Sequence, residues 1–177
     1  MGALIFIGGG VRSGKSSLAL RLAEQAGPRR GFIATAQAWD DEMRARIARH
    51  KDERDDSWRT VEEHLAVPDC LRAMTDCDVV LIDCLTLWLT NLLLAEEPDI
   101  QGRIAELLVA IDAVPFDVIV VTNEVGLGIV PANALSRRFR DEAGFAHQAL
   151  AAAAQSVYFG AMGMLLRLKP GPVEPVC

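Results

Sequence analysis

The chain has 177 residues, a length typical of one domain, and 51% of them are hydrophobic, enough to form a substantial core. Its 24 acidic residues outnumber its 18 basic ones, and the net charge of −6 argues against a general nucleic-acid-binding protein with a basic surface. The four cysteines and three histidines form no recognisable zinc motif. No secretory signal opens the chain, and polar residues interrupt its longest apolar stretch. We therefore expect one cytoplasmic domain, residues 1–177, without a membrane span.

Short apolar runs alternate with helix-like segments along the chain. Strands are predicted at residues 4–7, 32–35, 79–83 and 118–122, with two candidate closing strands at 156–159 and 165–168. Helices are predicted at residues 15–26, 40–54, 85–95, 100–113 and 134–154, the last with a candidate interruption at Gly144. This alternation predicts an α/β fold with a mostly parallel sheet flanked by helices, in which the closing strands are candidates for antiparallel pairing.

A glycine-rich loop follows the first predicted strand. Residues 9–16 match the phosphate-loop pattern G-x-x-x-x-G-K-[ST], in which glycines let backbone N–H groups turn toward an anion. The expected nucleotide contacts are Gly9, Gly10, Val11, Arg12, Ser13, Gly14, Lys15 and Ser16. Lys15 would reach the terminal phosphates, and Ser16 would offer its hydroxyl to Mg²⁺. The position between a strand and a helix favours a P-loop NTPase-like nucleotide site over a glycine turn without a ligand.

An acidic residue ends the predicted strand at residues 79–83. Asp83 lies where ligands gather in open parallel sheets, and it can hold Mg²⁺ together with Ser16, directly or through water. The alternative is that Asp83 caps the helix that begins near Leu85. The need of a phosphate loop for a metal partner favours the magnesium role.

A histidine shares one face of the predicted helix at residues 40–54 with apolar side chains. Met43, Ile47, His50 and Arg54 follow one another at helical spacing, so His50 is expected to point inward. An imidazole can act as a base, a metal ligand or a nucleophile. Periodicity alone, however, favours a half-buried structural histidine at this position.

Several motifs in order resemble the bifunctional adenosylcobinamide kinase/adenosylcobinamide-phosphate guanylyltransferase family of cobalamin biosynthesis. The resemblance covers nearly the whole chain. It includes the phosphate loop and residues 32–36, 41–43, 46–50, 54, 58–62, 82–92, 121–131, 138–141 and 144. It implies a kinase step that moves the γ-phosphate of ATP or GTP onto adenosylcobinamide. A second step then transfers GMP from GTP to adenosylcobinamide phosphate through a covalent histidine, and the matching position is His50.

The resemblance also implies which residues contact the nucleotide and how the chain assembles. Beside the phosphate loop, the implied contacts are Ala34, Thr35, Ala36, Lys51, Asp52, Glu53, Arg54, Glu62 and Asp83. A carboxylate such as Glu62 can accept hydrogen bonds from the N1–H and N2–H₂ edge of guanine. Without the resemblance, the surrounding sequence would favour an exposed acidic side chain with no ligand at this position. His50 and Lys15 would be the catalytic residues. Family members assemble as homotrimers, so the same is expected here.

Two positions depart from the family pattern. His147 precedes Gln148 where the family usually has asparagine, and residues 161–163 read Ala-Met-Gly where a Ser-Gly turn is usual. By itself His147 reads as a histidine on a helix face, without a role in the site. The departures concern the corrinoid substrate more than the nucleotide, because the nucleotide motifs are intact.

Three other functions compete with this one. A regulatory GTPase would need an N-K-x-D guanine motif, and the corresponding strand end reads Thr122-Asn123-Glu124-Val125. A plain small-molecule kinase with a structural His50 would never bind GMP covalently. A guanylyltransferase without the kinase step would keep Lys15 and Ser16, because both reactions need clamped phosphates.

Overall fold

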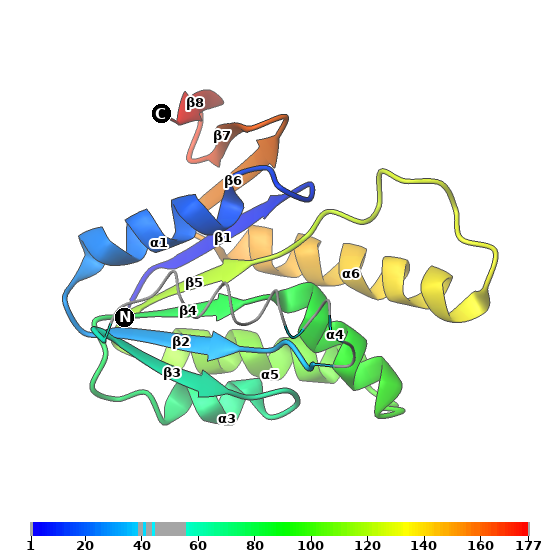
Figure 1. Ribbon diagram of the computed structural model, residues 1–177, viewed down its shortest axis with the longest axis horizontal. Helices are drawn as coiled ribbons and strands as arrows, with labels where there is room; N and C mark the ends of the chain where they lie inside the picture. Colours follow the sequence, from blue (N-terminus) through cyan, green and yellow to red (C-terminus); the bar gives the residue numbers. More distant parts are fainter. Residues whose placement is uncertain (1, 39–40, 42–43, 45–55, 177) are drawn as a thin grey trace.

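The computed structural model describes all of the chain except residues 1, 39–40, 42–43, 45–55 and 177 (Figure 1). The predicted helix at 40–54 therefore lies almost wholly outside the described residues, and with it His50 and the implied nucleotide contacts Lys51, Asp52, Glu53 and Arg54.

In the described part of the chain, one sheet of eight strands forms the centre of the molecule. The strands are β1 (Leu4–Gly9), β2 (Arg30–Ala34), β3 (Trp58–Glu62), β4 (Val79–Asp83), β5 (Asp117–Val121), β6 (Ser156–Ala161), β7 (Met164–Lys169) and β8 (Glu174–Val176). Their order is β3-β2-β4-β5-β1-β6-β7-β8, and all neighbours from β3 to β6 pair in parallel. The β6–β7 and β7–β8 pairs are antiparallel. The predicted α/β fold with antiparallel closing strands is confirmed.

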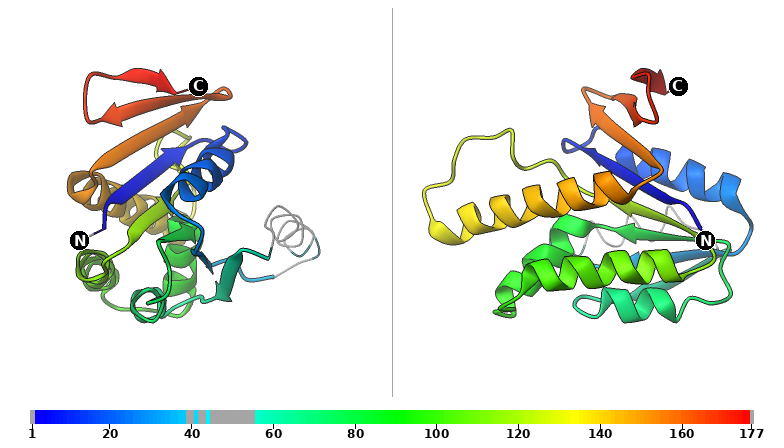
Figure 2. Two further views of the ribbon diagram at one scale, coloured as in Figure 1. Left: turned by 90° about the vertical axis from the view of Figure 1, so that its left-hand side faces the viewer. Right: turned by 180° about the vertical axis from the view of Figure 1, so that it is seen from behind.

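Helices cover both faces of the sheet. Those described are α1 (Lys15–Ala26), α3 (Val67–Arg72), α4 (Leu85–Leu94), α5 (Ile100–Ala113) and α6 (Ala134–Ala153). Figure 2 shows α1 on one face and the other four of these helices on the opposite face. The core is divided accordingly: Leu18 and Ala19 of α1 pack with Ile7 on one side, and Trp88 and Leu107 pack on the other. Among the described helices, none is long and apolar enough to cross a membrane.

Four features differ from the sequence-based expectations. Strand β3 was not predicted because it is an edge strand with mostly exposed side chains, and its Trp58 packs edge-on against Phe32. Helix α3 and strand β8 have only six and three residues, too few to show a periodicity. The expected break at Gly144 is wrong, since α6 continues through it. Buried residues on both sides of Gly144 stabilise the helix beyond the cost of one glycine, about 1 kcal/mol.

The strand order places β5 between the phosphate-loop strand β1 and the Asp83 strand β4. In the register of the sheet Val121 lies opposite both Ile7 and Asp83, and Ala34 lies opposite both Asp83 and Glu62. The carboxyl ends of these five strands, which are part of the six-stranded parallel section of the sheet, therefore meet at one edge, where open α/β sheets bind their ligands.

Candidate functional site at the carboxyl edge of the sheet

The phosphate loop begins where β1 meets β6. The Gly10 N–H donates to the Gly160 carbonyl at 3.1 Å, and a side chain on Gly9 would collide with that same carbonyl, since its Cβ would lie 2.2 Å from the oxygen. Gly9 and Gly14 both have positive φ, 144° and 91°. The sequence thus needs glycine at both ends of the loop, for a close backbone approach and for a left-handed turn into α1.

Lys15 lies inside this loop. Its side chain is buried, and Nζ donates to the Gly10 carbonyl at 2.5 Å and to Ser13 Oγ at 3.4 Å. Ser13 is buried as well, whereas Val11 and Arg12 are exposed at the tip of the loop. The ammonium group is therefore held in place by the loop itself, at the start of α1 where the helix dipole also favours an anion.

Three of the predicted nucleotide contacts lie side by side on neighbouring strands. Glu62, Ala34 and Asp83 occupy one register line at the ends of β3, β2 and β4. Glu62 is exposed, and Ala34 and Asp83 are half-buried. The N-cap of α4 is Cys84, and Asp83 is the last residue of the strand, so the alternative that Asp83 caps this helix is not confirmed.

Thr35, another predicted contact, has a supporting role in this structure. Its side chain is completely buried, and Oγ1 donates to the Cys84 carbonyl (2.9 Å) and accepts from the Cys84 N–H (2.8 Å). Its own carbonyl accepts from Asn91 Nδ2 at 2.8 Å. Thr35 thereby joins the end of β2 to the start of α4, while its half-buried neighbour Ala36 is more accessible.

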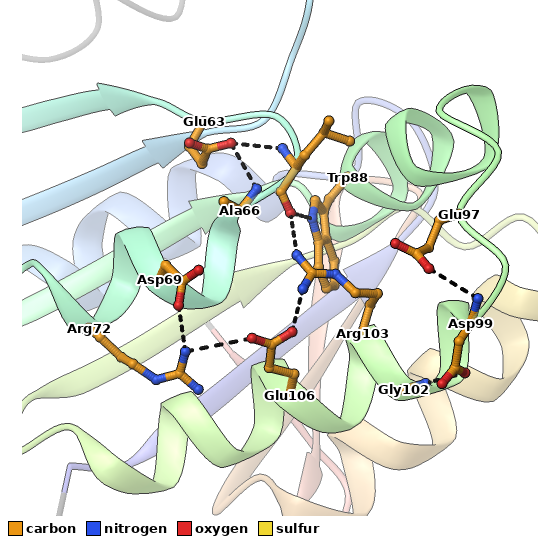
Figure 3. A network of polar contacts seen from close by, with 11 residues as sticks. Glu63, Ala66, Asp69, Arg72, Trp88, Glu97, Asp99, Gly102, Arg103 and Glu106 are labelled. Carbon is orange, nitrogen blue, oxygen red and sulfur yellow. Dashed lines mark hydrogen bonds and ion pairs between the residues drawn. The ribbon is translucent and has the colours of Figure 1, made fainter.

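A polar network fixes the loop that follows Glu62 (Figure 3). The Leu65 carbonyl accepts from Trp88 Nε1 and Arg103 Nη2, each at 3.0 Å, and Asn91 Nδ2 also donates to the His64 carbonyl at 3.1 Å. Arg103 is paired in turn with Glu106. The loop is thus tied to α4 and α5, which fixes the position of Glu62 next to it.

Glu63 stabilises the same loop from within. One of its carboxylate oxygens accepts from the backbone N–H groups of Leu65 and Ala66, both at 2.8 Å. Burial acts to raise the pKa of Glu63, but the backbone hydrogen bonds outweigh it and hold the pKa below its usual value.

His147, interpreted from the sequence as a histidine on a helix face, lies on the inward side of α6 and contacts two polar side chains. Its ring is largely buried, its Nε2 lies 2.8 Å from Thr122 Oγ1, and its Nδ1 lies 3.6 Å from a Glu124 carboxylate oxygen. Burial lowers the pKa of His147, although Glu124 acts to raise it. The spacing of His147 from buried Ala143 and Leu150 on α6 is a sequence signal from which this inward position could have been predicted.

The residues present fit a magnesium ion bound together with a nucleotide. Ser16 and Asp83 supply a hydroxyl and a carboxylate, the oxygen ligands that Mg²⁺ prefers, and α1 packs against β4. No group of three or more His, Cys, Asp or Glu side chains among the described residues could hold a metal by itself.

The fold and the loop define the chain as a P-loop NTPase-like protein. Solved structures with the same fold include the RadB recombinase (TM-score 0.55, 15% identity, covering 93% of this chain and 79% of that one). Another is the flagellar accessory protein FlaH from Methanocaldococcus jannaschii (TM-score 0.55, 16% identity, covering 98% and 86%). At these identities the likeness concerns the fold alone.

Sequence comparison shows the family. The family model described as cobinamide kinase / cobinamide phosphate guanyltransferase matches residues 5–168, and the chain belongs to this family. The bifunctional adenosylcobalamin biosynthesis protein CobP of Pseudomonas aeruginosa is 48% identical over 93% of this chain and 96% of that relative. The corresponding protein CobU of Salmonella typhimurium is 41% identical, over 94% and 99%. The family predicted from the motifs is confirmed, and with it the class of enzyme, a transferase.

Proposed function

We propose that the chain phosphorylates adenosylcobinamide and then transfers GMP to the product, with both reactions at the carboxyl edge of the sheet. The observation that carries this proposal is the convergence of the phosphate loop, Asp83, Ala34 and Glu62 at one edge in a chain that belongs to the kinase/guanyltransferase family. The nucleotides are ATP or GTP in the first step and GTP in the second.

In the kinase step the loop holds the phosphates in place. Its backbone N–H groups and the Lys15 ammonium would neutralise charge on the terminal phosphates while the hydroxyl of adenosylcobinamide attacks the γ-phosphorus. Ser16 and Asp83 would hold Mg²⁺, which supplies further charge neutralisation when it is bound. The γ-phosphoryl group moves to the acceptor, and the nucleoside diphosphate leaves.

In the guanylyl step we propose that His50 is the nucleophile. An imidazole nitrogen attacks the α-phosphorus of GTP, a P–N bond forms, and pyrophosphate leaves. A phosphate oxygen of adenosylcobinamide phosphate then attacks the same phosphorus, and His50 is released. Lys51, Asp52, Glu53 and Arg54 would contact the nucleotide beside it. Support for these five roles comes from the family resemblance, since all five residues lie outside the described part of the chain.

We propose that the carboxyl ends of β2 and β3 select guanine over other bases. The Glu62 carboxylate is exposed at the end of β3, where it can accept from the N1–H and N2–H₂ groups of guanine. The network around Leu65 and the Thr35 hydrogen bonds hold this edge in place.

We also propose a homotrimer. The connection between β5 and α6 extends away from the rest of the molecule (Figure 1) and carries Leu127 and Ile129, which are 85% and 96% exposed. Val130 and Leu135 are also exposed. Adjacent exposed apolar side chains favour contact with another protein surface, and the family resemblance indicates a second copy of this chain.

The decisive experiment uses purified protein, Mg²⁺ and GTP labelled at the α- or the γ-phosphate. We expect the protein to retain the α-label alone, in a form that is labile in acid and stable in base, as a phosphoramidate is. The His50→Ala variant should lose this label while still phosphorylating adenosylcobinamide. If the native protein phosphorylates adenosylcobinamide but takes up no α-label, it is a plain kinase and His50 is structural.

A further inference from the structure

A cluster of polar side chains just beyond the end of β5 has no part in the function proposed so far. It consists of Thr122, Glu124 and His147. The His147 ring lies between the other two side chains, with Nε2 2.8 Å from Thr122 Oγ1 and Nδ1 3.6 Å from Glu124 Oε2, and the ring also packs against Phe6. One arrangement of hydrogens satisfies all three groups: the Thr122 hydroxyl donates to Nε2, and Nδ1–H points to the carboxylate.

Backbone contacts fix this cluster beside the phosphate loop. The N–H groups of Thr122 and Glu124 donate to the carbonyls of Ile7 (2.9 Å) and Gly9 (3.0 Å), and Gly9 is the first residue of the loop. On the other side, Asn123 Nδ2 donates to Thr86 Oγ1 at 3.3 Å, near the start of α4. Glu124 therefore lies just beyond the end of β5, the strand that separates β1 and its phosphate loop from the Asp83 strand β4.

The Glu124 carboxylate is available as a base. Its side chain is partly exposed, and one oxygen accepts from the Gly126 N–H. Among the described residues, no lysine or arginine forms an ion pair with Glu124. Burial lowers the pKa of His147, although Glu124 acts to raise it, and the neutral form of the ring that burial favours orients the carboxylate without pairing with it as a cation.

We propose that Glu124 is the general base of the kinase reaction and that His147 is its positioning residue. The inference rests on the proposed function. As the hydroxyl oxygen of the acceptor bonds to the γ-phosphorus, its proton passes to a Glu124 oxygen. The bond from the γ-phosphorus to the bridging oxygen breaks, and the nucleoside diphosphate leaves with that electron pair. The protonated carboxyl then releases its proton to water through its exposed side.

The guanylyl step does not need a general base. A neutral imidazole attacks through a free electron pair, and a phosphate monoester attacks through an oxygen that is already anionic at pH 7. Neither nucleophile has a proton that must be removed in the transition state. Loss of Glu124 should therefore separate the two reactions of one protein.

The test measures both reactions in Glu124→Gln, which keeps the size of the side chain and an oxygen for the Gly126 N–H. We expect γ-phosphate transfer to adenosylcobinamide to slow about 10²–10⁴-fold in kcat, the range of general-base catalysis, with KM changed little. Uptake of α-label from GTP should stay at the native level. Glu142→Gln is the matched control, because Glu142 lies on α6 and contacts Gln101 and Arg138. This control should leave both reactions unchanged.

Two outcomes would overturn the inference. An unchanged kinase rate in Glu124→Gln would show that Glu124 is not the base. A parallel loss of both reactions would show that Glu124 only supports the loop through its turn. Failure of the proposed function is distinguishable, because the native protein itself would then fail to phosphorylate adenosylcobinamide, to take up α-label, or to do either.

The positioning role of His147 has its own readout. His147→Gln should slow the kinase about tenfold in kcat in the native background, as expected for a misplaced catalytic group. The same substitution should cause no further loss in the Glu124→Gln background. A purely structural role would slow both backgrounds equally, and that result would remove His147 from the proposal.

Discussion

At the scale of single residues, the phosphate loop depends on one buried cation. Lys15 is only 6% exposed, and its ammonium group donates to the Gly10 carbonyl and Ser13 Oγ. A lysine is seldom this buried unless it is paired, so these contacts explain how the loop keeps a charge inside. Phosphate oxygens would offer the same cation stronger, charged acceptors.

Removing this cation should impair both reactions. We predict that Lys15→Ala slows γ-phosphate transfer and α-label uptake by at least about 10²-fold each, the effect of losing one preorganised charge stabiliser. Rate measurements with saturating nucleotide check this. A loss confined to one reaction would show that the two reactions do not share the loop.

The lowered pKa of His147 makes stability depend on pH. Burial lowers this pKa, and the nearby Glu124 carboxylate offsets only part of the effect. The unfolded chain then binds more protons than the folded chain below about pH 6.5, so the free energy of unfolding falls as the pH drops from about 7 toward 5. Thermal melts across this range should show a smaller decline for His147→Gln than for the native protein. Equal declines would mean that other groups cause the loss.

At the scale of elements, Thr35 holds the end of β2 against the start of α4. Its hydroxyl is the partner of both the N–H and the carbonyl of Cys84 in a fully buried setting. Valine has a similar shape but would leave the buried Cys84 N–H unpaired, while the Cys84 carbonyl would keep only the Trp88 N–H as a donor. Residue 35 therefore needs a side chain that is small enough to be buried and that carries a hydroxyl for these hydrogen bonds, and threonine provides both.

We predict that Thr35→Val lowers the free energy of unfolding by about 1–3 kcal/mol. Thr60→Val is the matched control, because Thr60 is exposed on the neighbouring strand β3, and it should change stability by less than about 0.5 kcal/mol. Chemical denaturation of both variants gives the comparison. Similar losses in the two variants would contradict the role assigned to the Thr35 hydroxyl.

At the scale of the whole molecule, the extended β5–α6 connection is the feature that a single chain does not explain. Leu127 and Ile129 are almost fully exposed there, and neither belongs to either of the two core clusters. We predict that the double substitution Leu127→Ser/Ile129→Ser lowers the mass measured by sedimentation, while the native protein sediments as a trimer. A native monomer would contradict the proposed assembly, and a mutant that remains trimeric would place the contact elsewhere.

Much of the fold could be predicted because its signals are local. The buried parallel strands read as continuous apolar runs, and β4 and α5 begin and end at the predicted residues. The phosphate loop was predicted from its glycines and Lys15, since these residue types are required by backbone geometry and charge. Edge strand β3 was missed, because its exposed residues carry no apolar pattern and its pairing with β2 is a long-range contact.

The sequence by itself therefore determined the fold class, the phosphate loop and the family, because each of these rests on residue types at fixed local spacing. Only the tertiary structure decided that Glu62, Ala34 and Asp83 share one register line, and that His147 faces Glu124 and Thr122 rather than solvent. Such contacts join residues that lie far apart along the chain. They depend on the order of strands in the sheet and on which face of α6 packs against it, and neither is encoded in any single segment.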